Sequence, residues 1–456
     1  MTDGLARRQE ATRSGSTSPG ATWYAASCLE PPLDTVPLEG RATAAIGIVG
    51  GGLAGLALAL GLAERGAAPV VLEAGEVGAG ASGRNGGLLS AGFTRGFASL
   101  CRSLGVEAAT RLFRLSVAAV GLVERRIALG AIACRPQYGV LEASWFDQAD
   151  ALRAAIALEN ELFARDLRFW PREQLRQLYR SKRYFDGIFD PQARHLDPLA
   201  LTRGHARLAR AAGARLFERS PVTGIARQSG GWRVTTGRGR LDVDRLVLAT
   251  SAYGRGLHPA LGRGLLPIHT YIIVSEPLAG AERDSIRAPY AVFDDRFATG
   301  YYRLVGAEGE AGPRLLWGGQ IGLAEAPDGL AGRLLAELAL VYPDLGRIRV
   351  AHAWSGRMGF ARHRMPVIRE LEPGLWITTG FAGHGLNTTT MAGEMLAAAL
   401  LDPTGPAGDD WQLLAPFTLA WTGGPIGPLA AQAFYRSRAA QDRVRAAWHQ
   451  LRQRSP

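Results

Sequence analysis

The residues with the clearest chemical meaning are three glycines, Gly50, Gly52 and Gly55, and an acidic residue that follows them, Glu73. Glycines allow a tight turn and a close approach of phosphate, and the N–H groups at the start of a helix attract negative charge. A carboxylate about 20 residues farther on can accept hydrogen bonds from both ribose hydroxyls. The spacing predicts a dinucleotide site with contacts from Gly50, Gly52, Leu53, Ala54, Gly55 and Glu73.

The flanking residues supply the elements that would hold this site. Residues 46–49 are apolar enough for a short buried strand, residues 56–66 read as a helix, and residues 69–72 return as a strand that stops at Glu73. The alternative is a glycine-rich membrane span over residues 46–62. It is disfavoured because the run is shorter than the ~20 residues that a bilayer needs and begins as strand and turn.

A polar, glycine-dense segment follows Glu73 and contains S-G-R-N-G-G at residues 82–87. The backbone amides of such a loop can wrap around a ligand, and its arginine can meet a phosphate or a flavin oxygen. A mobile linker is the alternative. We favour cofactor contacts at Ser82, Arg84, Asn85, Gly86 and Gly87.

A second glycine turn, G-F-A-G-H-G at residues 380–385, follows an apolar strand at residues 376–379. We expect a helix over residues 388–401, with the three threonines 388–390 as candidate caps. Its dipole could stabilise the negative charge of a reduced flavin. The turn adds Gly383, His384, Gly385 and Leu386 to the predicted site, and its alternative is an ordinary strand-turn-helix crossover.

Residues 265–320 contain several strand-like runs that are rich in aromatic side chains. They predict an antiparallel sheet with one face toward a ligand, where Tyr271, Tyr302, Arg303 and Trp317 could line a pocket. Residues 101–180 carry apolar side chains at helical spacing and predict an inserted helical cap.

The composition of the 456 residues, 47% hydrophobic and 20% charged, is that of a globular protein long enough for two domains. The formal charge is +11, but the arginines are scattered, which disfavours nucleic-acid binding and suggests an anionic cofactor or substrate. Cys28, Cys101 and Cys134 are widely spaced, which fits a reducing compartment and forms no zinc pattern. We expect no metal site.

Both ends of the chain read as appendages. Residues 1–22 are polar and lack the apolar segment of a secretory signal, so we expect a flexible leader and a cytoplasmic enzyme. Residues 23–38 are proline-rich and are expected to run extended over the surface. Residues 410–456 predict a helical tail with a basic end, solvated rather than anchored to a membrane.

Taken together, these segments resemble the FAD-dependent amine and amino-acid oxidase family, the D-amino-acid oxidase superfamily. The resemblance rests on IGIVGGGLAGL with Glu73, GASGRNGG, LVLAT at residues 246–250, WSGRMGFARHRMP and GFAGHG. The chain is most similar to the gamma-glutamylputrescine oxidase branch. The resemblance implies an α/β fold, with a Rossmann-like FAD-binding domain of the glutathione-reductase type and an interleaved α+β substrate domain that contains an antiparallel sheet.

That architecture implies a discontinuous division of the chain. Residues 41–100, 185–260 and 350–405 would bind FAD, residues 101–184 and 261–349 would form the substrate and cap domain, residues 1–40 a leader and lead-in, and residues 406–456 the tail. FAD would lie extended, with its adenosine at residues 50–73 and near Val222. Its isoalloxazine would lie between residues 82–87 and 380–385, near Thr250. No histidine or cysteine occupies the S-G-R-N-G-G loop, so we expect FAD to be bound non-covalently.

Two departures from the family concern the substrate. Asn387 stands where sarcosine oxidases have a lysine, and Met358 where glycine oxidases have an arginine; those family residues hold a substrate carboxylate. An amide and a thioether cannot replace such charge-assisted hydrogen bonds. A longer amine, gamma-glutamylated or a polyamine, is therefore favoured over a small α-amino acid, although Arg357 could still supply a cation.

The resemblance implies oxidation of the C–N bond of a primary or secondary amine, by hydride transfer to FAD N5 and imine hydrolysis. The candidate residues for this reaction are Arg357, His384, Tyr302, Tyr271 and Asn387. The alternatives are a D-amino-acid or hydroxy-acid dehydrogenase on the same fold, a flavin-binding protein without turnover, and a nicotinamide dehydrogenase. Some members of the family activate oxygen with a lysine that lies over the flavin. Lys182 lies in the predicted cap and is a poor candidate for this role, so the electron acceptor could be oxygen or another molecule.

Overall fold

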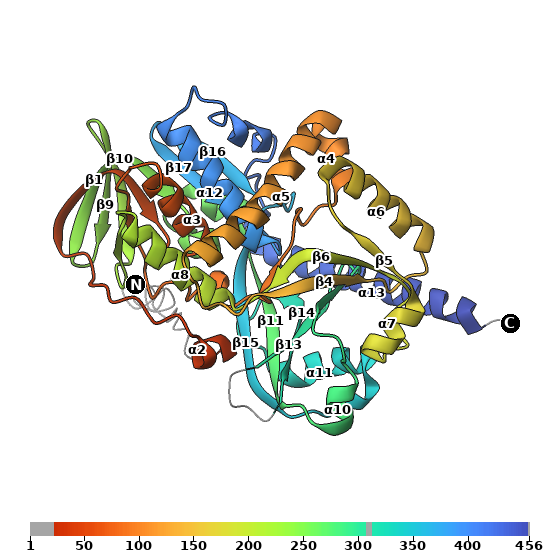
Figure 1. Cartoon of the computed structure of the whole chain (residues 1–456). Coiled ribbons are helices and arrows are strands. Elements are labelled where there is room, and N and C mark those ends of the chain that lie inside the picture. The colour runs from red at the N-terminus through yellow and green to blue at the C-terminus, as the bar shows by residue number, and fades with distance from the viewer. Residues whose placement is uncertain (1–21, 307–311, 455–456) are drawn as a thin grey trace.

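Two β-sheets organise the protein, one on the left and one on the right of Figure 1. The computed structural model describes residues 22–306 and 312–454, so the predicted leader lies outside the described residues up to residue 21. Helices pack on both sheets. The predicted α/β fold with an antiparallel second sheet is confirmed.

The first sheet is parallel at its centre. Its strands are, in spatial order, β16 (Val367–Glu372), β17 (Leu375–Thr379), β10 (Gly239–Leu248), β1 (Gly40–Val49), β2 (Val70–Leu72) and β7 (Arg215–Phe217), and β9 (Gly231–Thr236) joins β10 and β8 (Val222–Gln228). β10, which contains most of LVLAT, lies between β1 and β17 and runs parallel to both. Val49, Leu248 and Ile377 stand in register, so these three strands end at one edge of the sheet.

Two helices start from that edge. They are α3 (Leu53–Ala63) after β1 and α12 (Gly385–Leu401) after β17. Every residue of α3 is buried. A Cβ on Gly393 of α12 would lie 2.7 Å from the backbone of Ala57 in α3, so these two helices touch backbone to backbone. Small residues in both helices permit this contact.

The second sheet is antiparallel except where β12 runs beside β4. Its strands are β15 (Val350–Phe360), β11 (Leu266–Pro277), β14 (Arg314–Gly322), β13 (Tyr301–Val305), β12 (Ala291–Asp294), β4 (Gln137–Ala143), β6 (Gly187–His195) and β3 (Leu88–Leu89), with β5 (Arg168–Trp170) paired to β6.

Side chains of this sheet alternate between two faces, as successive residues of a strand do. The core face packs against α7 (Arg172–Tyr179) and α11 (Leu330–Val341) and carries Leu141, Val292, Tyr302 and Trp317. The other face, which we call the loop face, carries a row of paired residues: Glu142, Phe293, Tyr301 and Gly318.

The predicted helical cap contains α4 (Phe97–Leu104), α5 (Val106–Leu129), α6 (Ala149–Phe163) and α7, and also the strands β4 and β5, which the prediction missed. The other helices are α2 (Trp23–Ser27), α8 (Pro198–Ala211), α9 (Pro259–Gly264), α10 (Gly280–Asp284) and α13 (Gly427–Arg454), with short 3₁₀ turns at Ala81–Gly83, Ser251–Gly254, Pro343–Leu345, Asp410–Leu414 and Gly424–Ile426. Asp197 caps α8, and the tail is helical, as predicted.

Two expectations need correction. Residues 23–27 form the buried helix α2 instead of an extended surface segment, because Trp23 and Tyr24 are only 6% and 1% exposed and burial of aromatic surface outweighs the local preference. The predicted domain boundaries also do not follow the sheets, since β3, β6 and β15 pair in the second sheet. Among the described residues, no helix is both long and apolar enough to cross a membrane.

Candidate functional site

The first glycine turn connects β1 to α3 through several close approaches. Gly50 has φ +117°, a conformation that other residues rarely adopt. A Cβ on Gly55 would lie 2.0 Å from the Gly50 carbonyl oxygen, and a Cβ on Gly52 would lie 2.8 Å from the Ser82 hydroxyl. That hydroxyl accepts a hydrogen bond from the Leu53 N–H at 2.9 Å. Glycine is therefore needed for the start of α3 to approach both its strand and the loop at residues 82–87.

Glu73 lies beside this turn, directly after β2. Its carboxylate accepts hydrogen bonds from the Gly51 N–H at 2.7 Å and the Gly75 N–H at 2.9 Å. Burial raises the pKa of Glu73, and these two N–H groups lower it. The Glu73 carbonyl accepts from the Ser220 N–H at 2.8 Å, two residues before Val222. The chain thus brings Val222 toward the acidic residue.

The Asn85 side chain braces the loop at residues 82–87 from within. Its amide nitrogen donates to the carbonyls of Ala81 and Ser82, and its amide oxygen accepts from the Gly87 N–H. Gly87 has φ +76°. These local bonds hold the loop in one conformation, which a mobile linker would not have.

The same loop is also fixed to the second sheet. The Arg84 side chain donates to the Ser355 carbonyl in β15 at 2.8 Å, and the Trp354 indole donates to the Arg84 carbonyl at 3.0 Å. Arg303, on the loop face of β13, donates to the Gly86 carbonyl at 2.8 Å. The loop therefore lies between the two sheets.

The second glycine turn leads from β17 into α12. The helix begins at Gly385, earlier than the predicted residue 388, and His384 at its N-cap makes no side-chain cap hydrogen bond. The predicted capping by threonines is wrong: the hydroxyls of Thr388 and Thr389 donate backward to the carbonyls of His384 and Gly385 inside the helix. The first N–H groups of α12, from Gly385 and Leu386, are therefore suited to a negatively charged ligand.

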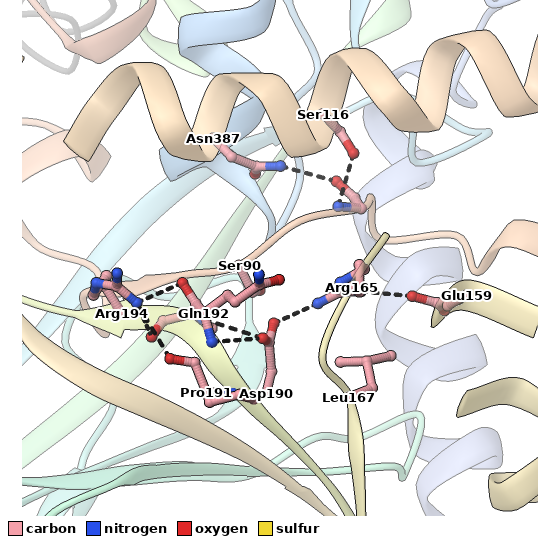
Figure 2. A network of polar contacts seen from close by, with 12 residues as sticks. Ser90, Ser116, Glu159, Arg165, Leu167, Asp190, Pro191, Gln192, Arg194 and Asn387 are labelled. Carbon is pink, nitrogen blue, oxygen red and sulfur yellow. Dashed lines mark hydrogen bonds and ion pairs between the residues drawn. The ribbon is translucent and has the colours of Figure 1, made fainter. Parts of the chain in front are cut away.

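His384 and Asn387 connect α12 to the segment after β3. His384 Nε2 lies 3.2 Å from the Ser90 carbonyl oxygen, and burial lowers the pKa of this imidazole. The Asn387 side chain donates to the Gly92 carbonyl at 3.2 Å, while the Gly92 N–H donates to Ser116 of α5 at 2.9 Å (Figure 2). Asn387 is 1% exposed, so the predicted substrate contact is replaced by a contact to backbone.

Both turns lie at one edge of the first sheet. Gly50 follows β1, Thr250 lies two residues after the end of β10, and Gly380 follows β17, whose parallel partners are in register. The Thr250 hydroxyl oxygen is buried and has no hydrogen-bond partner among the described residues. Two helix N-termini, a cradle that Cβ atoms would fill, a held carboxylate and this orphaned hydroxyl fit an extended dinucleotide.

Three residues that were predicted to line a pocket, Tyr271, Tyr302 and Trp317, lie instead in the core of the second sheet. Tyr302 stacks on Trp317 with ring centroids 5.2 Å apart, and its hydroxyl lies 2.8 Å from that of Tyr342. The Tyr271 hydroxyl donates to the Ala324 carbonyl at 2.6 Å. These rings lie in the core face, because alternation along a strand sends Tyr302 to the face opposite Arg303. This differs from the predicted lining role.

Arg357 lies in a polar cluster that the sequence did not reveal. Its guanidinium carbon is 4.1 Å from the centroid of the Tyr253 ring, and it stands opposite His269 across β15 and β11. Burial raises the pKa of Tyr253, Arg357 and Arg84 lower it, and Glu325 raises it. Tyr253 and Glu325 lie in connecting segments without a motif, so only the folded chain brings these charges together.

Comparison with known proteins gives one consistent result. The family described as FAD dependent oxidoreductase (DAO) matches residues 45–399. The chain is 31% identical over 388 residues to gamma-glutamylputrescine oxidoreductase of Escherichia coli, covering 83% of this chain and 88% of that protein. It is 29% identical over 384 residues to the probable oxidoreductase OrdL of Haemophilus influenzae, covering 83% and 86%.

Solved structures agree on the fold. Glycine oxidase from Geobacillus kaustophilus superimposes with a TM-score of 0.67 at 21% identity, over 83% of this chain and 99% of that one. L-proline dehydrogenase from P. horikoshii gives a TM-score of 0.66 at 19% identity, over 83% and 99%.

Proposed function

This chain belongs to the FAD-dependent oxidoreductases of the DAO family, and on that premise we propose that it oxidises the C–N bond of a primary or secondary amine of the gamma-glutamylputrescine or polyamine type. FAD is the cofactor of the family. The E. coli relative supports the substrate class through its name and its match over most of both chains.

The observation that carries the choice of a longer amine is the position of Asn387. Its amide is bound to the Gly92 carbonyl, and it is buried in α12. No cation is therefore supplied at this position for the carboxylate of a small α-amino acid. Met358 supplies none at the other position.

The proposed roles follow from the positions of the residues. The N–H groups around residues 50–55 hold the pyrophosphate, Glu73 the ribose, and Val222 and Thr250 lie along the cofactor. Arg84, His384 and the N–H groups of Gly385 and Leu386 surround the flavin ring, which is bound without a covalent link. The flavin supplies the two-electron acceptor for the hydride. The protein orients the amine and, by excluding water, favours its neutral form. We place the enzyme in the cytoplasm.

Anaerobic mixing of the purified protein with a panel of amines, followed by the absorbance of the oxidised flavin, tests this proposal. Diamines and N-acylated diamines are expected to bleach the flavin. Bleaching by α-amino or hydroxy acids alone would establish the dehydrogenase alternative. Protein whose flavin is reduced by light and by no substrate in the panel would be a flavin-binding protein without turnover. Reoxidation by air or only by a dye then identifies the acceptor.

A further inference from the structure

Glu142 is the one charged residue of strand β4 and lies one residue before its end. It pairs with Phe293 of β12, which pairs with Tyr301 of β13, so these three side chains form a row on the loop face. A Cβ on Gly86 would lie 2.5 Å from the Tyr301 ring, which places the loop at residues 82–87 over the other end of this row. With neighbouring strands ~4.8 Å apart, Glu142 lies roughly 10 Å from Tyr301.

The Glu142 side chain is half-buried. Its carboxylate has no hydrogen bond and no ion pair with any residue in the described part of the chain. Burial raises its pKa to about 7; the nearby carboxylates Asp295, Glu159 and Asp294 raise it further, and Arg165 lowers it. Even a half-buried carboxylate loses part of its hydration, and native proteins usually pair such groups.

Arg165 is the cation that acts on Glu142, and it already forms ion pairs with two other carboxylates. Arg165 pairs with Glu159 at 2.5 Å and also with Asp190 (Figure 2). Asp295 is held by the Ser144 hydroxyl, the Trp145 N–H and the Gln148 side chain, which are all neutral. Asp294 is paired with Arg296 at 2.6 Å, and Arg445 acts on Asp295 only as a more distant charge. Among the described residues, Glu142 and Asp295 are thus left without an ion pair, and the local field favours a positively charged ligand.

This acidic region adjoins the second glycine turn. The charge of Arg165 acts on the His384 imidazole and lowers its pKa, in addition to the larger effect of burial. His384 is also bound to Ser90, which follows β3 at the end of the second sheet. One face of the sheet thus runs from the proposed flavin ring to Glu142.

We propose that Glu142 binds a second ammonium group of the substrate, so that the enzyme selects amines that carry a positive charge at the end distant from the reacting C–N bond. The inference rests on the proposed amine oxidation and specifies its substrate class. A diamine, or a diamine acylated by an amino acid, carries such a group, and a simple alkylamine does not.

The test compares 1,4-diaminobutane with 1-aminobutane on the wild-type enzyme and on Glu142→Gln. The amide keeps the size of the side chain and removes its charge. We expect KM for the diamine to rise roughly tenfold to a hundredfold, as for loss of a charged hydrogen bond, with the rate of flavin reduction by 1-aminobutane unchanged. Glu142→Asp, which keeps the charge, should retain part of the preference. Glu161→Gln, an exposed position on α6, is the matched control and should behave as wild type.

A binding measurement without turnover separates this inference from the proposed function. Calorimetric titration of the photoreduced enzyme with 1,4-diaminobutane should show the same loss of affinity in Glu142→Gln. Equal effects on both amines, or none on either, would overturn the role of Glu142 even if amines reduce the flavin. If neither amine reduces the wild-type flavin, the titration alone decides whether Glu142 binds a diammonium ligand. The proposed function fails only if N-acylated diamines do not reduce the flavin either. The melting temperature of each variant reports whether it is folded.

Discussion

At the scale of single residues, the site depends on carboxylates with unequal surroundings. Glu73 is held by two backbone N–H groups, whereas Glu142 has none of its own. The first arrangement fixes an oxygen acceptor in place, and the second leaves a charge that a ligand can meet.

Glu73→Gln should weaken FAD binding. One of the N–H groups of Gly51 and Gly75 would face the NH₂ of the new amide, so one hydrogen bond is lost and the ribose acceptor is neutral. We expect Kd for FAD to rise roughly tenfold, measured by titrating the apoprotein with FAD and following flavin fluorescence. Glu76→Gln, three residues away, should leave Kd unchanged; an equal loss in both variants would argue against a specific ribose contact.

The preference for a diammonium substrate should depend on pH. Glu142 has its pKa raised to about 7 among Asp295, Glu159, Asp294 and Arg165. A carboxyl with a raised pKa is ionised only above it, so KM for 1,4-diaminobutane should rise as the pH falls from about 8 to about 6. In Glu142→Gln, the change of KM near pH 7 should vanish. Any remaining change of KM near pH 6 would come from Asp295, because burial raises the pKa of this carboxyl to about 6. An unaltered profile would exclude Glu142 as its source.

At the scale of elements, α3 and α12 set the distance between the two turns. Their backbones meet at Gly393, and the turns that precede them leave the same edge of the sheet. A change in the spacing of the helices therefore moves both helix N-termini.

Gly393→Ala should destabilise the protein by about 1–3 kcal/mol, because the new Cβ would lie 2.7 Å from the α3 backbone and push the helices apart. FAD retention should fall with it. Gly332→Ala in α11 is the control, since its Cβ would meet nothing within 4 Å and alanine is the better helix former, by up to about 1 kcal/mol. Opposite shifts in melting temperature are expected, and a stable Gly393→Ala variant would contradict the close packing.

At the scale of the whole molecule, the loop at residues 82–87 joins the two sheets. Arg303 is 6% exposed and donates to the carbonyls of Gly86 and Leu196 and to the Tyr24 hydroxyl. A single side chain thus connects the second sheet, the loop at residues 82–87 and helix α2.

Arg303→Met should lower the melting temperature and FAD content together, because two buried carbonyls and one hydroxyl lose their donor, at about 1–3 kcal/mol for each. Thermal unfolding followed by circular dichroism and by flavin release measures both. Arg168→Met removes an exposed arginine that pairs with Asp166 and should change neither measurement. Loss of FAD without loss of stability would show that the loop is not part of this connection.

The sequence by itself determined the nucleotide-binding half of this protein. Gly50, Gly55 and Glu73 lie close together along the chain, and their roles follow from backbone geometry that is local to one strand, one turn and one helix. The parallel strand ending near Thr250 and the turn before α12 were predictable for the same reason.

Only the tertiary structure decided which side chains lie on each face of the second sheet. Tyr302 and Arg303 are neighbours in sequence, yet the pleat of the sheet places Tyr302 in the core and Arg303 against the loop at residues 82–87. The hydroxyls of Thr388 and Thr389 donate to carbonyls inside the helix, so these threonines did not mark its start. The position of Glu142 depends on the pairing of β4 with β12, which places it beside Phe293, and it forms no ion pair with any described residue. The side of a strand that meets a ligand depends on long-range pairing, and no local pattern encodes it.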